Sequence, residues 1–310
     1  MKALICGSFA YDHIMVFKDY FKNHILPEKV HILNVSFMVP EMRREFGGCA
    51  GNIAYNLKLL KGSGLPMGTV GSDFSMYKEW MEKNNIEDTH IRVIDEVFTG
   101  QAFITTDLDD NQITTFYPGA MSYSHYNKVS DSTDISIGII SPDGRDGMLE
   151  HASQFQELDI PFIFDPGQGL PMFSGDELTN FIHQSTWVSV NEYEWQMMQS
   201  KTGLSSDEVT NLVKALIITR GGEGSVIYTN NKNYTIPAVD VELVSDPTGC
   251  GDAFRAGLLY GLMNEMDWET TGRVASIMGG IKIEHHGTQN HKFNYDYFNT
   301  RIEENFGYVI

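Results

Sequence analysis

The stretch 134-DISIGIISP-142 is the first of four apolar runs that decide the fold of this chain. The other three are "IPFIFDPG" at 160–167, "TWVSVN" at 186–191 and "KALIITRGG" at 214–222. A polar or helical stretch follows each run, and alternation at this spacing is typical of βαβ units with a mostly parallel sheet. We therefore expect an α/β fold with a mostly parallel main sheet.

Neighbouring segments extend this core. The apolar run "KALICGSF" at 2–9 suits a buried first strand, and "FGGCAGNIAYNLKLLKG" at 46–62 is interpreted as a loop leading into a helix. Beyond the alternating region, the pattern of 220–238 predicts an antiparallel hairpin at the sheet edge, with "NNKN" as its turn. Two helices, at 252–263 and 268–284, are expected to cover one face of the sheet.

Two other parts of the chain have a different pattern. Residues 11–45 contain "HIMVFKDYF" and "HILNVSFMV", whose near period of two is consistent with a sheet exposed on one side. Residues 91–118 contain β-branched runs on both sides of "DLDDNQ", which indicates a hairpin. We expect these two parts to form a small separate sheet, and the core to consist of residues 1–10, 46–90 and 119–310.

The composition excludes several classes of function. The chain of 310 residues has a formal net charge of -19 at pH 7, whereas nucleic-acid and anionic-membrane surfaces need basic patches. No stretch approaches the roughly 20 apolar residues of a membrane span, and the N-terminal residues do not resemble a signal peptide. The three cysteines are isolated, which indicates neither a zinc site nor a disulfide framework. We expect a soluble, cytoplasmic protein with no nucleic-acid or membrane partner.

The loop "DPTGCGDAFRAG" at 246–257 runs directly into one of the predicted helices. Gly249 and Gly251 let this loop fold tightly, so that its amides and the first helical N–H groups form an anion-binding nest. Asp252 lies inside that nest. It is either a first-turn acid that stabilises the helix or a base that takes a proton from a hydroxyl while the nest holds a phosphoryl group. The loop alone leaves both interpretations open.

Two further segments lie where strands end. In "NEYE", Asn191 and Glu194 suit a phosphate oxygen and a water-coordinated Mg²⁺, although helix capping explains the same pair. In "TRGGEG", Thr219, Gly221 and Gly224 offer a hydroxyl and bare backbone that phosphates can approach, although an ordinary turn has the same composition. The chain contains no P-loop sequence and no dinucleotide-binding glycine motif.

Together these motifs resemble a known family. In order, "FGGCAGN" (46–52), "NEYE" (191–194), "TRGGEG" (219–224) and "DPTGCGDAFRAGLL" (246–259) are similar to the signatures of the ribokinase-like carbohydrate and nucleoside kinases. The resemblance covers essentially the whole chain. Within that family the chain is most similar to bacterial adenosine kinases, on "GSFAYDHIMVF" (7–17), "LPEKVHILNVSF" (26–37), "TTDLDDNQITTFYPGAMS" (105–122) and "GTQNH" (287–291).

The resemblance implies a fold, an activity and a set of partners. The fold is a three-layer, Rossmann-like α/β core with a small β-sheet lid. The activity is ATP-dependent phosphorylation of the 5′-hydroxyl of a purine nucleoside such as adenosine, with Mg²⁺ as the metal, in a homodimer formed through the lid. Three alternatives stay open: a broad nucleoside kinase that takes inosine, guanosine or cytidine, a sugar kinase such as ribokinase, and an inactive nucleotide-binding regulator.

The resemblance also implies roles for individual residues. The general base that activates the acceptor hydroxyl is Asp252, and the anion hole for the transferred phosphoryl group is formed by Gly249, Cys250 and Gly251. The ribose hydroxyls are held by Asp12, Gly48 and Asn52, and the rest of the nucleoside contacts Ser8, Ser36, Phe116 and Gln168. The ATP side consists of Asn191, Thr219, Gly221, Gly224 and Gly251, and Mg²⁺ is positioned through water by Glu194.

Two positions depart from the adenosine kinase pattern. An aromatic residue is expected at position 102, but the chain has Ala102, with Phe103 one step further along and therefore on the opposite face of a strand. The motif "DPGQG" has Gly169 where a second glutamine is expected. Both changes lie around the base, so they put adenine specificity in doubt and leave the kinase chemistry unaffected.

Some polar residues have no assigned role. Arg255 either helps to neutralise phosphate or lies on the helix surface. His285, His286 and His291 are interpreted as solvated loop residues rather than a metal cluster, because no carboxylate or cysteine lies at ligand spacing.

Overall fold

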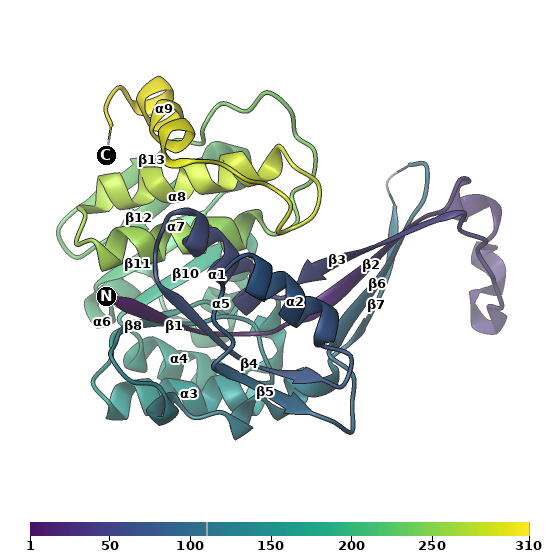
Figure 1. Ribbon diagram of the computed structural model, residues 1–310, viewed down its shortest axis with the longest axis horizontal. Helices are drawn as coiled ribbons and strands as arrows, with labels where there is room; N and C mark the ends of the chain where they lie inside the picture. The colour runs from purple at the N-terminus through teal and green to yellow at the C-terminus, as the bar shows by residue number, and fades with distance from the viewer. Residues whose placement is uncertain (110, 310) are drawn as a thin grey trace.

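The computed structural model describes residues 1–109 and 111–309, and within them the chain forms two separate β-sheets (Figure 1). The larger sheet has nine strands in the order β13–β12–β11–β10–β9–β8–β1–β4–β5. These strands are β1 (Lys2–Cys6), β4 (Gly64–Gly71), β5 (His90–Ile94), β8 (Ile135–Ile140), β9 (Phe162–Phe164), β10 (Trp187–Asn191), β11 (Ala215–Thr219), β12 (Ser225–Tyr228) and β13 (Asn233–Ile236). The strands from β11 to β5 are parallel, and β12 and β13 form the antiparallel edge hairpin that the sequence predicts.

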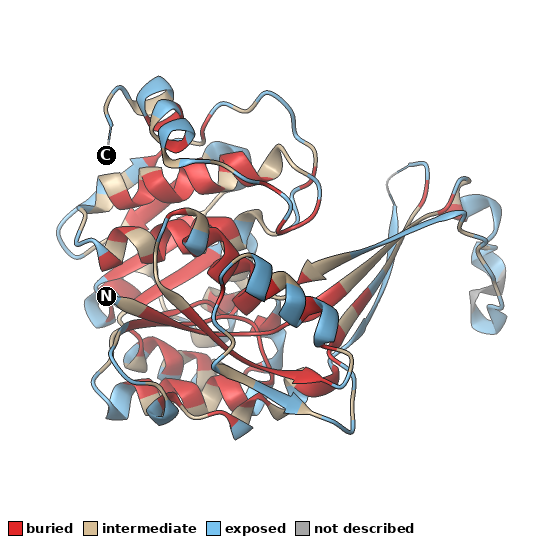
Figure 2. Ribbon diagram, in the orientation of Figure 1, coloured by how far each residue is buried: buried red, intermediate tan, exposed pale blue. Residues whose placement is uncertain are grey.

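Helices cover both faces of this sheet, whose central strands are buried between them, while the edge strands β5 and β13 are partly exposed (Figure 2). Alternate residues of β1 identify the two faces. Ala3 and Ile5 belong to one buried cluster, with residues of α1 (Cys49–Leu59), α2 (Ser75–Lys83), α7 (Cys250–Met263) and α8 (Trp268–Ile283). Leu4 and Cys6 belong to the other, with residues of α3 (Arg145–Glu157), α4 (Gly175–Gln184), α5 (Glu192–Thr202) and α6 (Ser206–Leu212). The predicted three-layer α/β core is confirmed.

A ninth α-helix of the described chain, α9 (Tyr295–Phe306), packs on α8 through Phe298 and Ile302. The shorter 3₁₀ helices are η1 (Phe21–Asn23), η2 (Pro27–Ile32), η3 (Gly119–Tyr126), η4 (Val129–Asp131), η5 (Gly167–Met172) and η6 (Gly221–Glu223). No helix in the described part of the chain combines the length and hydropathy that a membrane span requires.

The second sheet, which we call the lid sheet, has four strands in the order β3–β2–β6–β7. They are β2 (Ala10–Val16), β3 (Glu41–Gly47), β6 (Gly100–Thr106) and β7 (Gln112–Tyr117). The lid sheet projects from the body as an arm, and its far end, residues 17–40, is the lid tip (Figure 1). The hairpin of β6 and β7 is the predicted one, and Asp110 in its turn lies outside the described residues.

Two segments that the sequence assigns to this sheet do not form part of it. Residues 90–94 form β5, which pairs in parallel with β4 in the large sheet, because α2 returns the chain to that open edge. Residues 31–39 form no strand. Ile32 (66%), Leu33 (49%) and Met38 (87%) stay exposed because no neighbouring strand lies beside them, whereas Phe37 packs on Phe17. The partner of β2 is residues 41–47.

Polar contacts fix the base of the lid sheet to the body. The Tyr11 hydroxyl donates to the main-chain carbonyl of Asp73 (3.0 Å), and the Asp73 carboxylate accepts from the amide (2.8 Å) and hydroxyl (2.7 Å) of Thr99. The Gln101 amide donates to the other oxygen of Asp73 (3.0 Å). One loop after β4 therefore holds both central strands of the lid sheet, while the lid tip extends away from the body.

Candidate active site

The glycine loop before α7 has the geometry of an anion nest. Gly249 is the N-cap of α7 with φ of 79°, and a Cβ at this position would lie 3.0 Å from Thr288. The Asp246 carboxylate accepts hydrogen bonds from the main-chain N–H groups of Thr248 and Gly287, each with an N···O distance of 2.9 Å. Positive φ and close packing require glycine at 249. The fixed loop leaves the free N–H groups at the start of α7 available to an anion.

Asp252 lies in the first turn of α7 and is held from another helix. The side-chain amide of Asn52, on α1, donates to Asp252 Oδ2 at 2.8 Å. Burial raises the pKa of the Asp252 carboxyl, and the Arg255 charge and the Asn52 hydrogen bond oppose that shift. An aspartate that only stabilised its own helix would not need a partner from α1. Asp252 is therefore tied to a second helix and is not only a first-turn acid of α7, and its role as the base remains a prediction.

Arg255 is not the surface residue that the sequence left open. Its side chain is 12% exposed and forms an ion pair with Asp165, which directly follows β9 and is itself 1% exposed. A Cβ added at Gly251 would clash with the Arg255 guanidinium, so this cation lies beside the anion nest. Burial raises the pKa of Asp165 to about 7, and the charge of Arg255 opposes that rise. The sequence gives no sign of the Arg255–Asp165 pair, since the two residues lie 90 positions apart.

The residues predicted to hold a ribose lie close to Asp252. Asp12 is in register with Glu45 and Ala102 on its neighbouring strands. Burial, followed by the charges of Asp252, Glu45 and Asp246, raises the pKa of Asp12 to about 6. Gly48 is the N-cap of α1 with φ of 88°, and the first turn of that helix carries Asn52. The structure brings a carboxylate and an amide together beside Asp252, and their contact with a sugar remains a prediction.

The loop 287–291, "GTQNH", organises this cluster. The Gln289 side-chain amide donates to Asn52 Oδ1 (2.9 Å) and to the Tyr77 hydroxyl (2.6 Å), and the Trp80 indole donates to Gln289 Oε1 (2.9 Å). The Thr288 hydroxyl donates to the carbonyl of Phe46 at the end of the lid sheet (2.5 Å). Gln289 therefore fixes the amide orientation of Asn52. The sequence alone does not reveal these contacts of Gln289, because its partners lie more than 200 positions away in the chain.

The histidine prediction is wrong for His291. This side chain is fully buried, and its Nε2 lies 2.7 Å from Asn56 Oδ1 on α1. The Tyr55 hydroxyl donates to its carbonyl (2.6 Å). His291 therefore locks the end of the loop against α1, and burial lowers its pKa to about 3.

Ser8 and Ser36 differ in their distance from the cluster. The Ser8 hydroxyl accepts from the Cys49 amide (3.2 Å) and its carbonyl from the Ala50 amide (3.0 Å), so Ser8 satisfies the start of α1. Ser36 is exposed and lies in the lid tip, where the neighbouring Phe37 packs on Phe17. Within one chain the structure does not bring Ser36 to Asp252, because β2 carries the chain away from the body.

The lid sheet presents Phe116 and Ala102 on the face that carries Asp12. Ala102 pairs with Asp12 on one side and with Phe116 on the other, and opposed residues share a face. Phe116 is 46% exposed. Phe103 stacks on His13 on the other face, with ring centroids 4.7 Å apart, as the one-residue shift predicts. Gln168 is exposed in η5, three residues beyond Asp165.

The predicted ATP side lies at the ends of β10 and β11. Asn191 and Thr219 are paired neighbours. Asn191 and Glu194 form a capping box for α5, with both reciprocal bonds at 2.8 Å, so the capping interpretation is realised. Gly221 and Gly224 have positive φ, and a Cβ at Gly221 would meet nothing within 4 Å. This open backbone leaves room for a ligand, and the ATP and Mg²⁺ roles remain predictions.

The acids of the site fit Mg²⁺ bound through water. Among the described residues, no group of three or more His, Cys, Asp or Glu side chains is arranged to hold a metal ion. Mg²⁺ usually keeps several waters and takes one or two carboxylates together with substrate phosphates. Glu194, whose charge is felt at both Asp165 and Arg255, suits that mode.

Comparison with known proteins identifies the family. The sequence pattern of the pfkB family carbohydrate kinases matches residues 12–293. The chain belongs to this family. It is 32% identical over 280 residues to a nucleoside kinase of Methanocaldococcus jannaschii, covering 89% of this chain and 92% of that protein.

Solved structures extend the comparison. A nucleoside kinase of Burkholderia thailandensis in complex with inosine is 49% identical, with a TM-score of 0.91 and 99% of each chain covered. Another structure of that kinase, in complex with ADP-inosine, is 50% identical with a TM-score of 0.88, covering 99% of this chain and 97% of that chain. This pfkB-family chain is a phosphotransferase that acts on a hydroxyl group, with ATP and Mg²⁺ as cofactors.

The carboxylate cluster predicts a pH-dependent effect of Asp12→Asn on stability. The pKa of Asp12 is about 6 when folded, above its ordinary value of 3.8. Between these values the unfolded chain releases a proton that the folded chain keeps, so the folded state loses stability as the pH rises, and the full loss is present above pH 6. We expect Asp12→Asn to gain thermal stability over the natural protein through this range and to keep the gain at higher pH.

Calorimetry of both proteins from pH 4 to pH 8 measures this difference. Asp95→Asn, in an exposed turn, is the matched control for the loss of one charge. An Asp12→Asn protein that is less stable than the natural one at pH 8 would contradict the prediction.

Proposed function

We propose that the protein transfers the γ-phosphoryl group of ATP to the 5′-hydroxyl of a purine nucleoside, with Asp252 as the general base. The observation that carries this proposal is the hydrogen bond from Asn52 to Asp252, beside the N-terminus of α7 and within the electrostatic reach of Asp12. A buried carboxylate, a side-chain amide and the N-terminus of α7 meet in one cluster, which supports roles for them as proton acceptor, diol-binding group and anion nest. The nucleoside kinases that the chain resembles support the acceptor class.

In this proposal each group has one task. Asp252 accepts the proton of the acceptor hydroxyl, and Asn52 keeps the carboxylate oriented toward it. The cis-diol is held by the Asp12 carboxylate and by the hydrogen-bonding capacity of the Asn52 amide that Asp252 and Gln289 leave free. A carboxylate accepts hydrogen bonds from the diol, and an amide can both donate and accept them. The amides of Gly249, Cys250 and Gly251 bind the negative charge of the phosphoryl group, with Arg255 beside them, and the Cys250 amide exchanges its hydrogen bond to the Pro247 carbonyl (3.2 Å) for one to the phosphoryl group. Bound ATP supplies the phosphoryl group, and Mg²⁺ neutralises its phosphates.

The lid sheet is proposed to cover the nucleobase of the bound nucleoside. Phe116 offers an exposed ring on the site face, and the small Ala102 lies between it and Asp12. The methyl group of Ala102, in place of a second aromatic ring beside Phe116, leaves space next to the nucleobase. This space favours a range of purine nucleosides that includes adenosine, inosine and guanosine. The inosine complex of the 49% identical kinase supports this broader range.

The test is an acceptor panel of adenosine, inosine, guanosine, cytidine and ribose, followed by ADP release. We expect the purine nucleosides to be phosphorylated and ribose to give a kcat/KM about a hundredfold lower. The same panel with Ala102→Phe should narrow the range of bases. A strong preference for free ribose would replace this proposal with a sugar kinase, and no ADP release with any acceptor would favour the inactive regulator.

Replacing the base tests the mechanism. We expect Asp252→Asn to lower kcat by about 10²–10⁴-fold, because the amide cannot accept the proton, while nucleoside binding changes little. Binding by calorimetry and turnover by ADP release separate the two effects. Asp267→Asn, at the N-cap of the neighbouring helix α8, is the control for a carboxylate outside the cluster. Near-normal turnover of Asp252→Asn would show that another group is the base.

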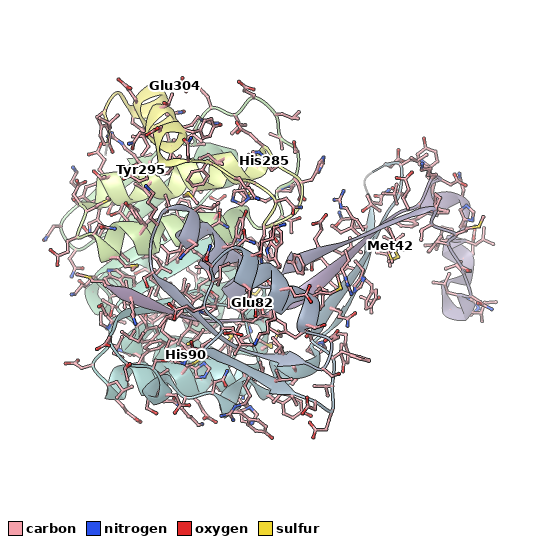
Figure 3. All side chains as sticks on the ribbon, viewed as in Figure 1. Met42, Glu82, His90, His285, Tyr295 and Glu304 are labelled. Carbon is pink, nitrogen blue, oxygen red and sulfur yellow. The ribbon has the colours of Figure 1, made fainter. Side chains whose placement is uncertain are left out.

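We further propose a homodimer formed through the lid sheet. Large apolar side chains are exposed on the lid sheet and its tip, with Ile32 at 66%, Met38 at 87% and Met42 at 66%, and Met42 stands clear of the body in Figure 3. A second copy would cover them and bring Ser36 close to a site. Light scattering should give twice the chain mass for the natural protein and for Leu243→Glu, and the monomer mass for Met38→Glu. A monomeric natural protein would contradict this proposal.

A further inference from the structure

Lys282 is a buried cation that the proposed reaction does not use. It lies in the last turn of α8 and is fully buried. Its ammonium donates to the main-chain carbonyl of Asp246 at 2.7 Å and to that of His285 at 3.2 Å. These two carbonyls belong to the loops on either side of the anion nest, so one charged group joins both loops.

The surroundings of this ammonium are unusual for a lysine. Among the ion pairs of the described residues none includes Lys282. Burial lowers its pKa, and the groups whose charges oppose that shift are Cys250, Asp246 and Asp252. A cation taken from water and bonded only to neutral oxygens costs stability unless something offsets it. Here its field acts on the anion nest and on the proposed base.

The loop that Lys282 holds is the start of the nest. The amides of Ser245 (2.8 Å) and Asp246 (3.2 Å) donate to the carbonyl of Ile283, at the end of α8. The Asp246 carboxylate binds the amides of Thr248 and Gly287. A shift of Asp246 would therefore move Gly249, three residues further along, and the amides that follow it.

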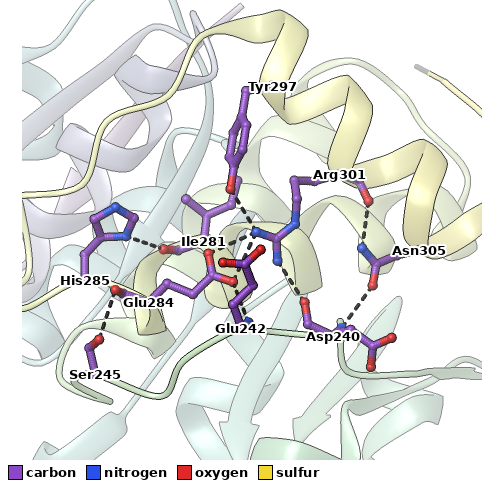
Figure 4. A network of polar contacts seen from close by, with 9 residues as sticks. All are labelled: Asp240, Glu242, Ser245, Ile281, Glu284, His285, Tyr297, Arg301 and Asn305. Atoms are coloured by element: carbon purple, nitrogen blue, oxygen red, sulfur yellow. Dashed lines mark hydrogen bonds and ion pairs between the residues drawn. The ribbon is translucent and has the colours of Figure 1, made fainter.

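The end of α8 is itself immobilised, as Figure 4 shows. The Arg301 guanidinium, from α9, donates to both carboxylate oxygens of Glu284 (2.9 and 3.2 Å) and to the Asp240 carbonyl (2.9 Å). The Ser245 hydroxyl donates to the Glu284 carbonyl (3.0 Å). Lys282 thus extends from a fixed main chain, and its ammonium has a defined position.

We propose that Lys282 is a positioning residue whose ammonium acts as a built-in monovalent cation, coordinated by the carbonyls of Asp246 and His285, so that the anion nest is ordered without a free ion of K⁺ size. Main-chain carbonyl oxygens bind K⁺ and ammonium alike, because both are singly charged and of similar size. The proposal rests on the proposed function for its kinetic readout, and on stability for a readout independent of substrate.

The deciding variant is Lys282→Met, which keeps most of the apolar side chain and removes the ammonium. Turnover is measured in choline, lithium, potassium and ammonium chloride at one ionic strength. We expect the natural protein to have the same kcat in all four salts. We expect Lys282→Met to lose kcat by about tenfold or more in choline, and to regain most of it with potassium or ammonium but not with lithium. Lys282→Arg keeps a charge and should remain indifferent to the salt.

Lys201→Met is the matched control. The Lys201 ammonium also donates to two main-chain carbonyls, those of Pro171 (3.1 Å) and Phe173 (2.6 Å), but it is exposed and lies on α5. If each lysine only held loops in place, Lys282→Met and Lys201→Met would respond to potassium in the same way. We expect no selective response to potassium from Lys201→Met.

Thermal unfolding in the same salts supplies the second readout. Potassium should raise the melting temperature of Lys282→Met by about 2 °C or more over choline, and should leave the natural protein unchanged. The change in melting temperature does not depend on which acceptor the enzyme uses. It therefore distinguishes a failure of this proposal from a failure of the proposed function. The proposal is overturned if potassium selectively activates the natural protein, or if Lys282→Met responds alike to every salt. Should Lys282→Met not fold, the natural protein and Lys282→Arg still decide, since a potassium requirement in either overturns it.

Discussion

The hydrogen bond between Asn52 and Asp252 is the contact on which the site depends. It joins the first turns of α1 and α7, from residues 200 positions apart, so both helix N-termini point at one place. The remaining contacts keep the two partners in position. Gln289 orients the Asn52 amide, Gly249 starts α7 at the required point, and the positive φ at Gly48 does the same for α1.

The site also depends on a balance of buried charge. The carboxylates of Glu45, Asp246 and Asp252 all lie within electrostatic reach of Asp12. Opposing them are the guanidinium of Arg255, which is paired with Asp165, and the ammonium of Lys282. Each cation is buried next to the nest, where low polarisability strengthens its field. These two cations therefore offset part of the negative charge around the nest, in a strongly acidic protein whose formal net charge is -19.

The sequence predicted the core well because its signals are local. Apolar runs alternating with helical stretches require no knowledge of distant partners, and neither does the loop from Gly249 to Asp252. Residues 31–39 show the limit, since their near period of two resembles a strand, yet a strand needs a neighbour and β2 pairs with residues 41–47 instead. The same limit hid Asp165, Gln289 and Lys282, whose roles come from partners in other elements. His291 was placed in solvent because its contact with Asn56 spans 235 positions.

The carboxylates around Asp252 have a consequence for the end of the catalytic cycle. In the proposed reaction a neutral nucleoside enters beside Asp12 and Asp252, and the same molecule leaves carrying a phosphate dianion. Asp12, which binds the uncharged diol in that reaction, then repels the new charge, and so does Asp252 once it has released the proton that it accepted. This repulsion grows once ADP and its metal have departed. The carboxylates around Asp252 thereby favour release of the phosphorylated nucleoside. For the same reason this product competes only weakly with the unphosphorylated nucleoside for the site.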